Sequence, residues 1–193
     1  MYTGGKANKA FVGNLILYLA EKCAPLGHTK LLKLLYLIDQ ESTIKRGYPM
    51  TWLSYKVWSL GPVSEDVYFS KNSGCNKFSE YVKFVTEDDR SCKIIPKSKI
   101  KFDDSEFSDS DMDIIDSIIA KYKSKTSRQL VEVTHSKNGL WDKFKKLYGL
   151  KFTEDNKTSD VEIDFSELIK DDKFKKSLFL SDKENMELHS VVG

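Results

Sequence analysis

Three histidines and three cysteines are the residues of this chain best suited to metal binding or nucleophilic chemistry. None of them form the Cys-x-x-Cys or His-x-x-x-His pairs that metal sites use, so we expect neither a metal nor a cofactor. Cysteine catalysis would need Cys23, His135 and an orienting group such as Asn138 to meet in the fold. No catalytic signature surrounds any cysteine, and Cys23 falls on the apolar face of a helical pattern. The sequence therefore predicts a protein that is not an enzyme.

Four lysines, Lys93, Lys97, Lys99 and Lys101, crowd one short stretch. The last three would share a face if the chain were extended there, and that face would suit nucleic acid. A solvated strand edge, protected from aggregation by its lysines, is the commoner reason for such a pattern. Because 31 basic residues face 29 acidic ones, the chain has no overall field that attracts nucleic acid. We expect nucleic acid not to be a partner, and a DNA-binding regulator stays as an alternative.

Three large aromatic side chains lie within seven residues of one short segment: Trp52, Tyr55 and Trp58. The segment favours a strand through residues 51–60, closed by Gly61 and Pro62. In a regular strand the two tryptophans would point to one face and the tyrosine to the other. One face must pack on the rest of the protein. Because exposed aromatic residues often anchor interfaces, we predict these three residues as candidate partner-binding residues.

Helical periodicity dominates the N-terminal part of the chain. Apolar residues recur four apart from Phe11 to Cys23 and predict a first helix. Thr29 is a plausible N-cap for a second helix ending near Gly47. This second helix has apolar residues at i, i+3, i+4 and i+7, and we expect them in the core: Leu31, Leu34, Leu35 and Ile38.

The remaining elements are a hairpin and further helices. Residues 81–86 and 91–95 predict a β-hairpin, and Pro96 ends its second strand or marks an edge. The pairs Ser108/Asp111 and Thr126/Gln129 resemble capping boxes that begin helices. A further amphipathic segment runs over residues 140–148. Residues 151–160 read as a loop, residues 160–168 as a short strand or helix start, and Ser181 with Glu184 as the cap of a short last helix.

Taken together, these elements predict an α+β fold that is mainly α, with five or six helices packed around a small antiparallel sheet or hairpin. A length of 193 residues fits one domain that folds without disulfides or metals. The odd, unpatterned cysteines fit a reducing compartment. With no recognisable signal peptide or membrane span, we expect a cytoplasmic protein without a membrane partner.

One combination of motifs is more specific than its parts. The pattern Lys-Leu-x-Lys-Leu-x-Tyr occupies residues 30–36, a Gly-x-Pro step follows at residues 47–49, and Gly-Pro-Val stands at residues 61–63 after the aromatic segment. This combination resembles the Panacea antitoxin domain, the family that includes SocA-like antitoxins. The resemblance covers about residues 8–148, with residues 149–193 as a C-terminal extension packed on the same domain. The motif residues are Tyr36, Asp39, Gly61, Pro62, Thr134, His135 and Trp141.

The resemblance implies a bacterial antitoxin of a type II toxin–antitoxin system that binds a cognate toxin protein. Within the family, SocA-like action as an adaptor that delivers the toxin to a cellular protease is the close variant. Leu60 departs from the pattern, because an aromatic residue is commoner before Gly-Pro in the family.

Five of the motif residues also have a structural explanation. Tyr36 and Asp39 can brace their helix, the Gly61-Pro62 pair can turn a strand into a helix, and His135 can satisfy a backbone group. We expect structural roles to outnumber binding roles among these residues, since buried and turn positions are commoner than binding positions.

Overall fold

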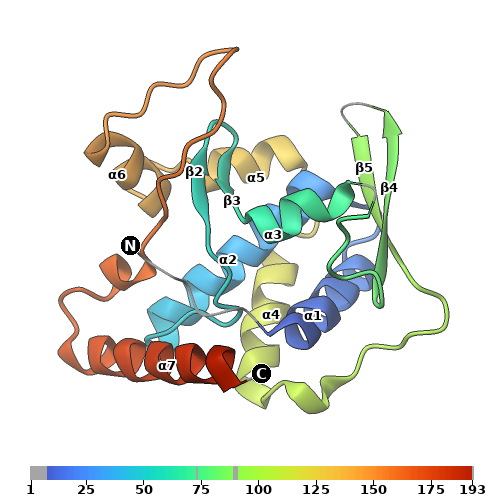
Figure 1. Ribbon diagram of the computed structural model, residues 1–193, viewed down its shortest axis with the longest axis horizontal. Coiled ribbons are helices and arrows are strands. Elements are labelled where there is room, and N and C mark those ends of the chain that lie inside the picture. The colour runs from blue at the N-terminus through green and yellow to red at the C-terminus, as the bar shows by residue number, and fades with distance from the viewer. Residues whose placement is uncertain (1–7, 73, 89–90, 193) are drawn as a thin grey trace.

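The computed structural model describes residues 8–72, 74–88 and 91–192. Within those ranges the chain forms seven α-helices and five short strands, so the predicted mainly helical α+β class is confirmed with more helices than expected. Helix α2 (His28–Arg46) runs through the middle of the molecule (Figure 1). Helices α4 and α5, strand β3 and a 3₁₀ turn in the C-terminal segment all contact it. The core is therefore built around α2.

The first two helices begin and end for identifiable reasons. Helix α1 (Lys9–Lys22) starts where the Asn8 side chain accepts hydrogen bonds from two backbone amides of the first turn. Helix α2 ends at Gly47, whose φ of 101° suits glycine. Its N-cap is Gly27, so the prediction that Thr29 caps it is wrong. Thr29 lies inside the first turn because β1 (Leu26–Gly27) leads directly into the helix. The four apolar residues predicted for the α2 core are fully buried.

Two small antiparallel sheets lie on either side of α3. Strands β4 (Val82–Asp88) and β5 (Ser91–Pro96) form the predicted hairpin, and β1 pairs with β5. Its turn residues at 89 and 90 lie outside the described residues. Strand β5 ends at Pro96 and a turn follows. The extended lysine face over residues 97–101 is therefore not formed.

The second sheet is a tight hairpin of β2 (Lys56–Trp58) and β3 (Gly61–Val63). The prediction of a strand through residues 51–60 is wrong, because only three of those residues are strand and Trp52 has a φ of 53°. Gly61 and Pro62 lie within β3, which leads into the short helix α3 (Glu65–Tyr68) and a 3₁₀ turn (Phe69–Lys71). The pair therefore belongs to a paired strand instead of a turn.

The second half begins with a 3₁₀ turn (Asp104–Glu106) and helices α4 (Asp109–Tyr122), α5 (Ser127–Thr134) and α6 (Leu140–Leu147). Both predicted capping boxes are present at the starts of α4 and α5. Each satisfies amide groups at a helix start and fixes where the helix begins. Helix α4 packs against α2, and α5 packs against both α2 and β3.

The C-terminal segment follows the surface of the other elements (Figure 1). It passes along β2, forms the 3₁₀ turn η3 (Phe165–Leu168) and ends in α7 (Lys173–Val192). Ser181 lies in the middle of α7, so the prediction that it caps a short last helix is wrong. The helix begins about two turns earlier, after a hydrogen-bonded turn at Asp172. Within the described residues, no helix has the length and apolar character needed to cross a membrane.

Candidate partner-binding site

A buried carboxylate joins α2 to the aromatic segment. Asp39 is fully buried and accepts hydrogen bonds from the Thr51 amide at 2.7 Å, the Thr51 hydroxyl at 2.5 Å and the Tyr55 hydroxyl at 2.7 Å. Burial raises the pKa of Asp39 to about 6, although these hydrogen bonds act in the opposite direction. The Tyr36 ring lies edge-on to Tyr55, with ring centroids 5.4 Å apart. The motif residues Tyr36 and Asp39 therefore fix residues 51–55 onto α2.

A second cluster holds the β2–β3 hairpin against α2 and α5. Gly61 has a φ of 98°, and a Cβ atom there would lie 2.8 Å from the Thr134 hydroxyl. Both facts favour glycine. The Pro62 carbonyl accepts a 2.7 Å hydrogen bond from the Lys33 ammonium group, which is almost fully buried. Burial lowers the pKa of Lys33 to about 7.

Sequence reasoning did not single out Lys33 as a functional residue. The pattern that could have indicated it is a lysine with leucines on both sides, in the helix with the strongest apolar periodicity. A charged residue in such a position is exceptional unless something pairs with it.

His135 and Trp141 form a third cluster beside the hairpin. Their rings stack with centroids 3.7 Å apart and 13° between planes. The Trp141 indole donates a 2.9 Å hydrogen bond to the Trp58 carbonyl. Burial, followed by the charge of Lys33, lowers the pKa of His135 to about 4. Its Nε2 atom is buried with no hydrogen-bond partner among the described residues. His135 thus acts through ring stacking, and the expected backbone contact is not seen at Nε2.

The three aromatic residues predicted to bind a partner have different surroundings. Tyr55 is in the core, whereas Trp52 and Trp58 are half-buried. Trp52 lies before β2 with a φ of 53°, so its position does not follow from strand alternation. The Trp52 indole donates a 2.7 Å hydrogen bond to Asp182 of α7, and its ring lies 5.1 Å from that of Phe179. This contact places α7 over Trp52. Of the three candidates, Trp58 lies nearest the exposed hairpin tip.

The outer edge of β2 is also covered. The amides of Val57 and Ser59 donate to the carbonyls of Val161 and Lys157, at 2.9 and 2.8 Å. The Ile163 amide donates to the Tyr55 carbonyl at 2.8 Å. Residues 157–163 therefore pair with β2 in an antiparallel manner, as Figure 1 shows beside β2.

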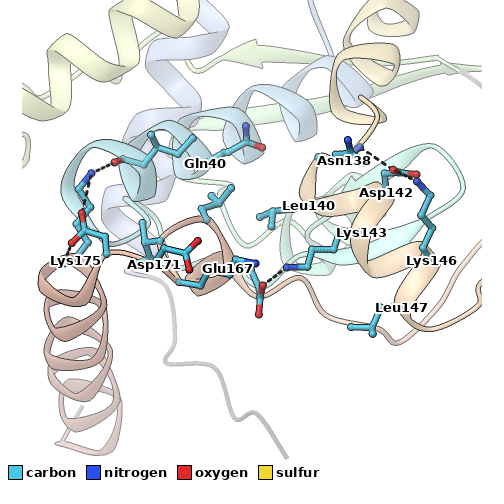
Figure 2. A pocket seen from close by; sticks show the side chains of 16 residues that line it. Gln40, Asn138, Leu140, Asp142, Lys143, Lys146, Leu147, Glu167, Asp171 and Lys175 are labelled. Atoms are coloured by element: carbon cyan, nitrogen blue, oxygen red, sulfur yellow. Dashed lines mark hydrogen bonds and ion pairs between the residues drawn. The ribbon is translucent and has the colours of Figure 1, made fainter.

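A groove of about 1160 Å³ lies between α2, α6, η3 and the beginning of α7 (Figure 2). Apolar side chains line it, including Ile44, which is 41% exposed, and Leu147, which is 68% exposed. Lys143 pairs with Glu167 across the groove, and Lys146 pairs with Asp142 along α6. An apolar groove with charges of both signs on its rim suits a protein surface. Sequence reasoning missed it because its walls come from three separate parts of the chain.

Groups that could support other chemistry do not converge. Within the described ranges, no three His, Cys, Asp or Glu side chains are placed to hold a metal ion. Cys23 is buried in the core as predicted, and burial raises the pKa of its thiol. A thiol with a raised pKa is a weak nucleophile at neutral pH.

The motif clusters described above all lie inside the region matched by a known protein family. A family model described as "Antitoxin SocA-like, Panacea domain" matches residues 31–142, which is more than half of the chain. The chain belongs to this family. Comparison with curated proteins and with solved structures gave no match. Membership supports an antitoxin-type role with a protein partner and favours a non-enzymatic function.

The Panacea domain supplies only part of the surfaces described above. The matched residues contain most of α2, the β2–β3 hairpin and the start of α6, together with all seven motif residues. The segment that covers β2, the 3₁₀ turn that lines the groove and α7 all lie outside residues 31–142. Within the groove, the residues from α2 and the start of α6 lie inside the family match. Lys143, Lys146 and Leu147 of α6, together with η3 and α7, lie outside it.

Proposed function

We propose that this chain is the antitoxin of a type II toxin–antitoxin pair and neutralises its cognate toxin protein by direct binding. Family membership carries the antitoxin part of this proposal. The exposed apolar side chains beside the groove support the binding part, because well-formed apolar patches with a polar rim are common at protein interfaces.

We place the main toxin contact in the groove, with Leu147 as an anchor. Leu147 is 68% exposed on α6, and Tyr148 beside it is 58% exposed. A large apolar side chain with that exposure can anchor an interface, because a partner that covers it removes its surface from water. The fitting partner surface presents apolar side chains flanked by charges, which can exchange with the rim pairs Lys143–Glu167 and Lys146–Asp142.

The hairpin tip is the second contact that we propose. Trp58 is half-buried, and Leu60 at the tip is 61% exposed. Trp52 and Tyr55 support this contact from beneath and do not touch the toxin in the arrangement seen here, since Tyr55 is 1% exposed and α7 packs on Trp52.

Co-expression tests the proposal. The protein encoded by the adjacent gene is expressed alone and together with this chain, and growth, co-purification and toxin level are measured. We expect rescue and a stoichiometric complex at an unchanged toxin level. A shortened toxin half-life would instead indicate protease delivery. If the adjacent product is toxic and this chain neither rescues growth nor co-purifies with it, the antitoxin proposal is wrong.

Single variants locate the surface. Leu147→Asp should weaken toxin binding by roughly thirtyfold or more, as expected for an interface anchor, without lowering the melting temperature. Trp58→Ala tests the hairpin in the same way. Leu180→Asp is the matched control, because Leu180 is a 52% exposed leucine on α7 that does not line the groove. Equal losses in Leu147→Asp and Leu180→Asp would contradict the groove assignment.

A further inference from the structure

A second cavity, of about 580 Å³, lies apart from the proposed toxin groove. Its walls come from the beginning of α2, the β2–β3 hairpin and the turn after α3. Strands β4 and β5, the first residue of α5 and residues 157–158 of the C-terminal segment complete it. Its volume falls in the range of sites for small molecules, about 300–1000 Å³. Trp58 and Tyr68 form an aromatic wall, with ring centroids 4.8 Å apart. The groove proposed as the main toxin contact does not share residues with this cavity, whereas Trp58 and Leu60 of the proposed hairpin contact line it.

The lining of this cavity carries positive charge without any carboxylate. Lys33, Lys71 and Lys157 are among the lining residues, and none of the described lining residues is Asp or Glu. The charges of Lys71 and Lys33, after the larger effect of burial, help to lower the pKa of His28 to about 4. The Lys71 ammonium group lies 4.0 Å from the centroid of the Tyr68 ring, and both residues line the cavity. A set of lining cations with no carboxylate among the described lining residues favours an anionic ligand.

Lys33 is the most telling member of this set. Its side chain is almost fully buried, and its only hydrogen bond among the described residues is to the Pro62 carbonyl. An ammonium group has three donors, so Lys33 keeps donor capacity that no group among the described residues uses. Burying a cation without an opposite charge is costly. An anion bound in the cavity would compensate that cost.

The backbone adds to the same field. Helix α2 is 19 residues long, and its first turn lines the cavity through Gly27, His28 and Thr29. Its N-cap glycine offers no side chain to the free amide groups of that turn. The positive end of the helix dipole therefore lies at the cavity. The Thr29 and Ser127 hydroxyls supply neutral donors at the same wall.

We propose that this cavity binds the phosphate group of a small phosphorylated molecule, with Lys33, Lys71 and Lys157 as its ligand-binding residues. Phosphate fits better than a carboxylate because its several oxygens and multiple charge can engage three lysines and free amide groups together. The aromatic wall of Trp58 and Tyr68 and the volume of the cavity leave room for an organic group of nucleoside size.

Thermal melting at constant ionic strength tests this proposal on the full chain. The probes are inorganic phosphate, pyrophosphate and ATP at millimolar concentration, with sodium chloride and adenosine as controls. We expect the phosphorylated probes to raise the melting temperature and the controls to leave it unchanged, because a ligand that binds only the folded state stabilises it. A larger shift with ATP than with pyrophosphate would identify a nucleotide, whereas equal shifts would identify the phosphate groups alone as the source of binding.

Lysine variants then decide whether the effect belongs to the cavity. Lys71→Met and Lys157→Met should each raise the Kd of the tightest-binding probe by about tenfold. That change corresponds to the loss of one charge-assisted hydrogen bond. Lys151→Met is the matched control, since Lys151 is an exposed lysine of the same C-terminal segment that does not line the cavity. Lys71 and Lys157 both lie outside the core, so we expect both variants to fold as the wild type does. The proposal is overturned if no phosphorylated probe stabilises the wild type, or if Lys71→Met and Lys157→Met respond as the wild type does.

Discussion

The inner and outer sides of the segment at residues 51–59 are held by different kinds of interaction. On the inner side, the Thr51 and Tyr55 side chains donate hydrogen bonds to the fully buried Asp39. On the outer side, backbone amides and carbonyls of β2 pair with residues 157–163. The inner side depends on three particular side chains. The outer side depends on the position of the backbone, which many sequences can supply.

The family match covers the inner side and not the outer side. The motif residues Tyr36 and Asp39 face the inner side and lie within the matched residues 31–142. The residues that cover the outer side lie beyond that match and include several that are exposed. Loss of an inner partner leaves buried polar groups unsatisfied, whereas loss of an outer side chain leaves the backbone pairing in place. The inner side should therefore be the more sensitive to mutation.

The largest effect is expected for Asp39→Ala. This change leaves the Thr51 amide and the Tyr55 hydroxyl buried without their acceptor, at about 1–3 kcal/mol for each group. We expect the free energy of unfolding to fall by about 3 kcal/mol or more, measured by urea denaturation. Asp113→Ala, at an exposed aspartate of α4, is the control and should stay within about 0.5 kcal/mol of the wild type. A similar small change in Asp39→Ala would show that the inner network adds little stability.

The pH dependence of the inner side is a sharper test. The folded-state pKa of Asp39, about 6, lies above its ordinary value of 3.8. Between these values the folded state binds the proton more tightly than the unfolded state. The contribution of Asp39 to stability is therefore greatest below about pH 4 and falls as pH rises through 6. The difference in unfolding free energy between wild type and Asp39→Asn should be larger at pH 4 than at pH 7.

Comparing wild type with Asp39→Asn also removes the effect of the histidines on stability, which changes with pH in the opposite direction. Burial lowers the pKa values of His28 and His135 to about 4, so the stability that depends on their neutral forms is lost as pH falls from 6.5 toward 4. Both histidines are present in wild type and variant, and their effect cancels in the comparison. A difference that stays constant from pH 4 to pH 7 would contradict the raised pKa of Asp39.

A moderate effect is expected for Trp52→Ala on the outer side. The change removes the ring contact with Phe179 and the hydrogen bond to Asp182, both on α7. Because Trp52 is half-buried, we expect a loss of about 2 kcal/mol, below the 3–5 kcal/mol of a fully buried tryptophan. Hydrogen exchange should rise in α7 while the amides of α2 stay protected. Phe174→Ala, at a 72% exposed residue of the same helix, should leave exchange unchanged. If hydrogen exchange in Trp52→Ala rose equally for the amides of α2 and α7, the two sides would unfold together.

The smallest effect is expected for Ser159→Ala. The Ser159 hydroxyl donates a 2.6 Å hydrogen bond to the Val57 carbonyl, beside backbone pairs that the change leaves intact. A partly exposed hydrogen bond of this kind contributes about 1 kcal/mol, and the melting temperature should fall only slightly. Thr158→Ala, at an exposed neighbour, is the control. A loss as large as that of Asp39→Ala would erase the distinction between the two sides.

The sequence by itself determined several of the local elements of this protein. Helical periodicity located α2 and its four core residues, and the capping boxes at Ser108 and Thr126 marked the starts of α4 and α5. These features depend on neighbours within about four residues, so a local pattern contains them. The motif combination at residues 30–36 and 61–63 also identified the family, which the match over residues 31–142 shows.

Only the tertiary structure decided what surrounds those elements. Trp52 and Trp58 are covered by a segment about 100 residues or more away in the chain, and no local pattern specifies that pairing. The groove and the lysine-lined cavity are each assembled from at least three separate segments. The sequence shows that position 33 of the buried helix is a lysine. Its hydrogen bond to the Pro62 carbonyl exists only because the β2–β3 hairpin folds over α2. Contacts between distant segments depend on how the whole chain packs, and for that reason the surfaces available to partners were not readable from the sequence.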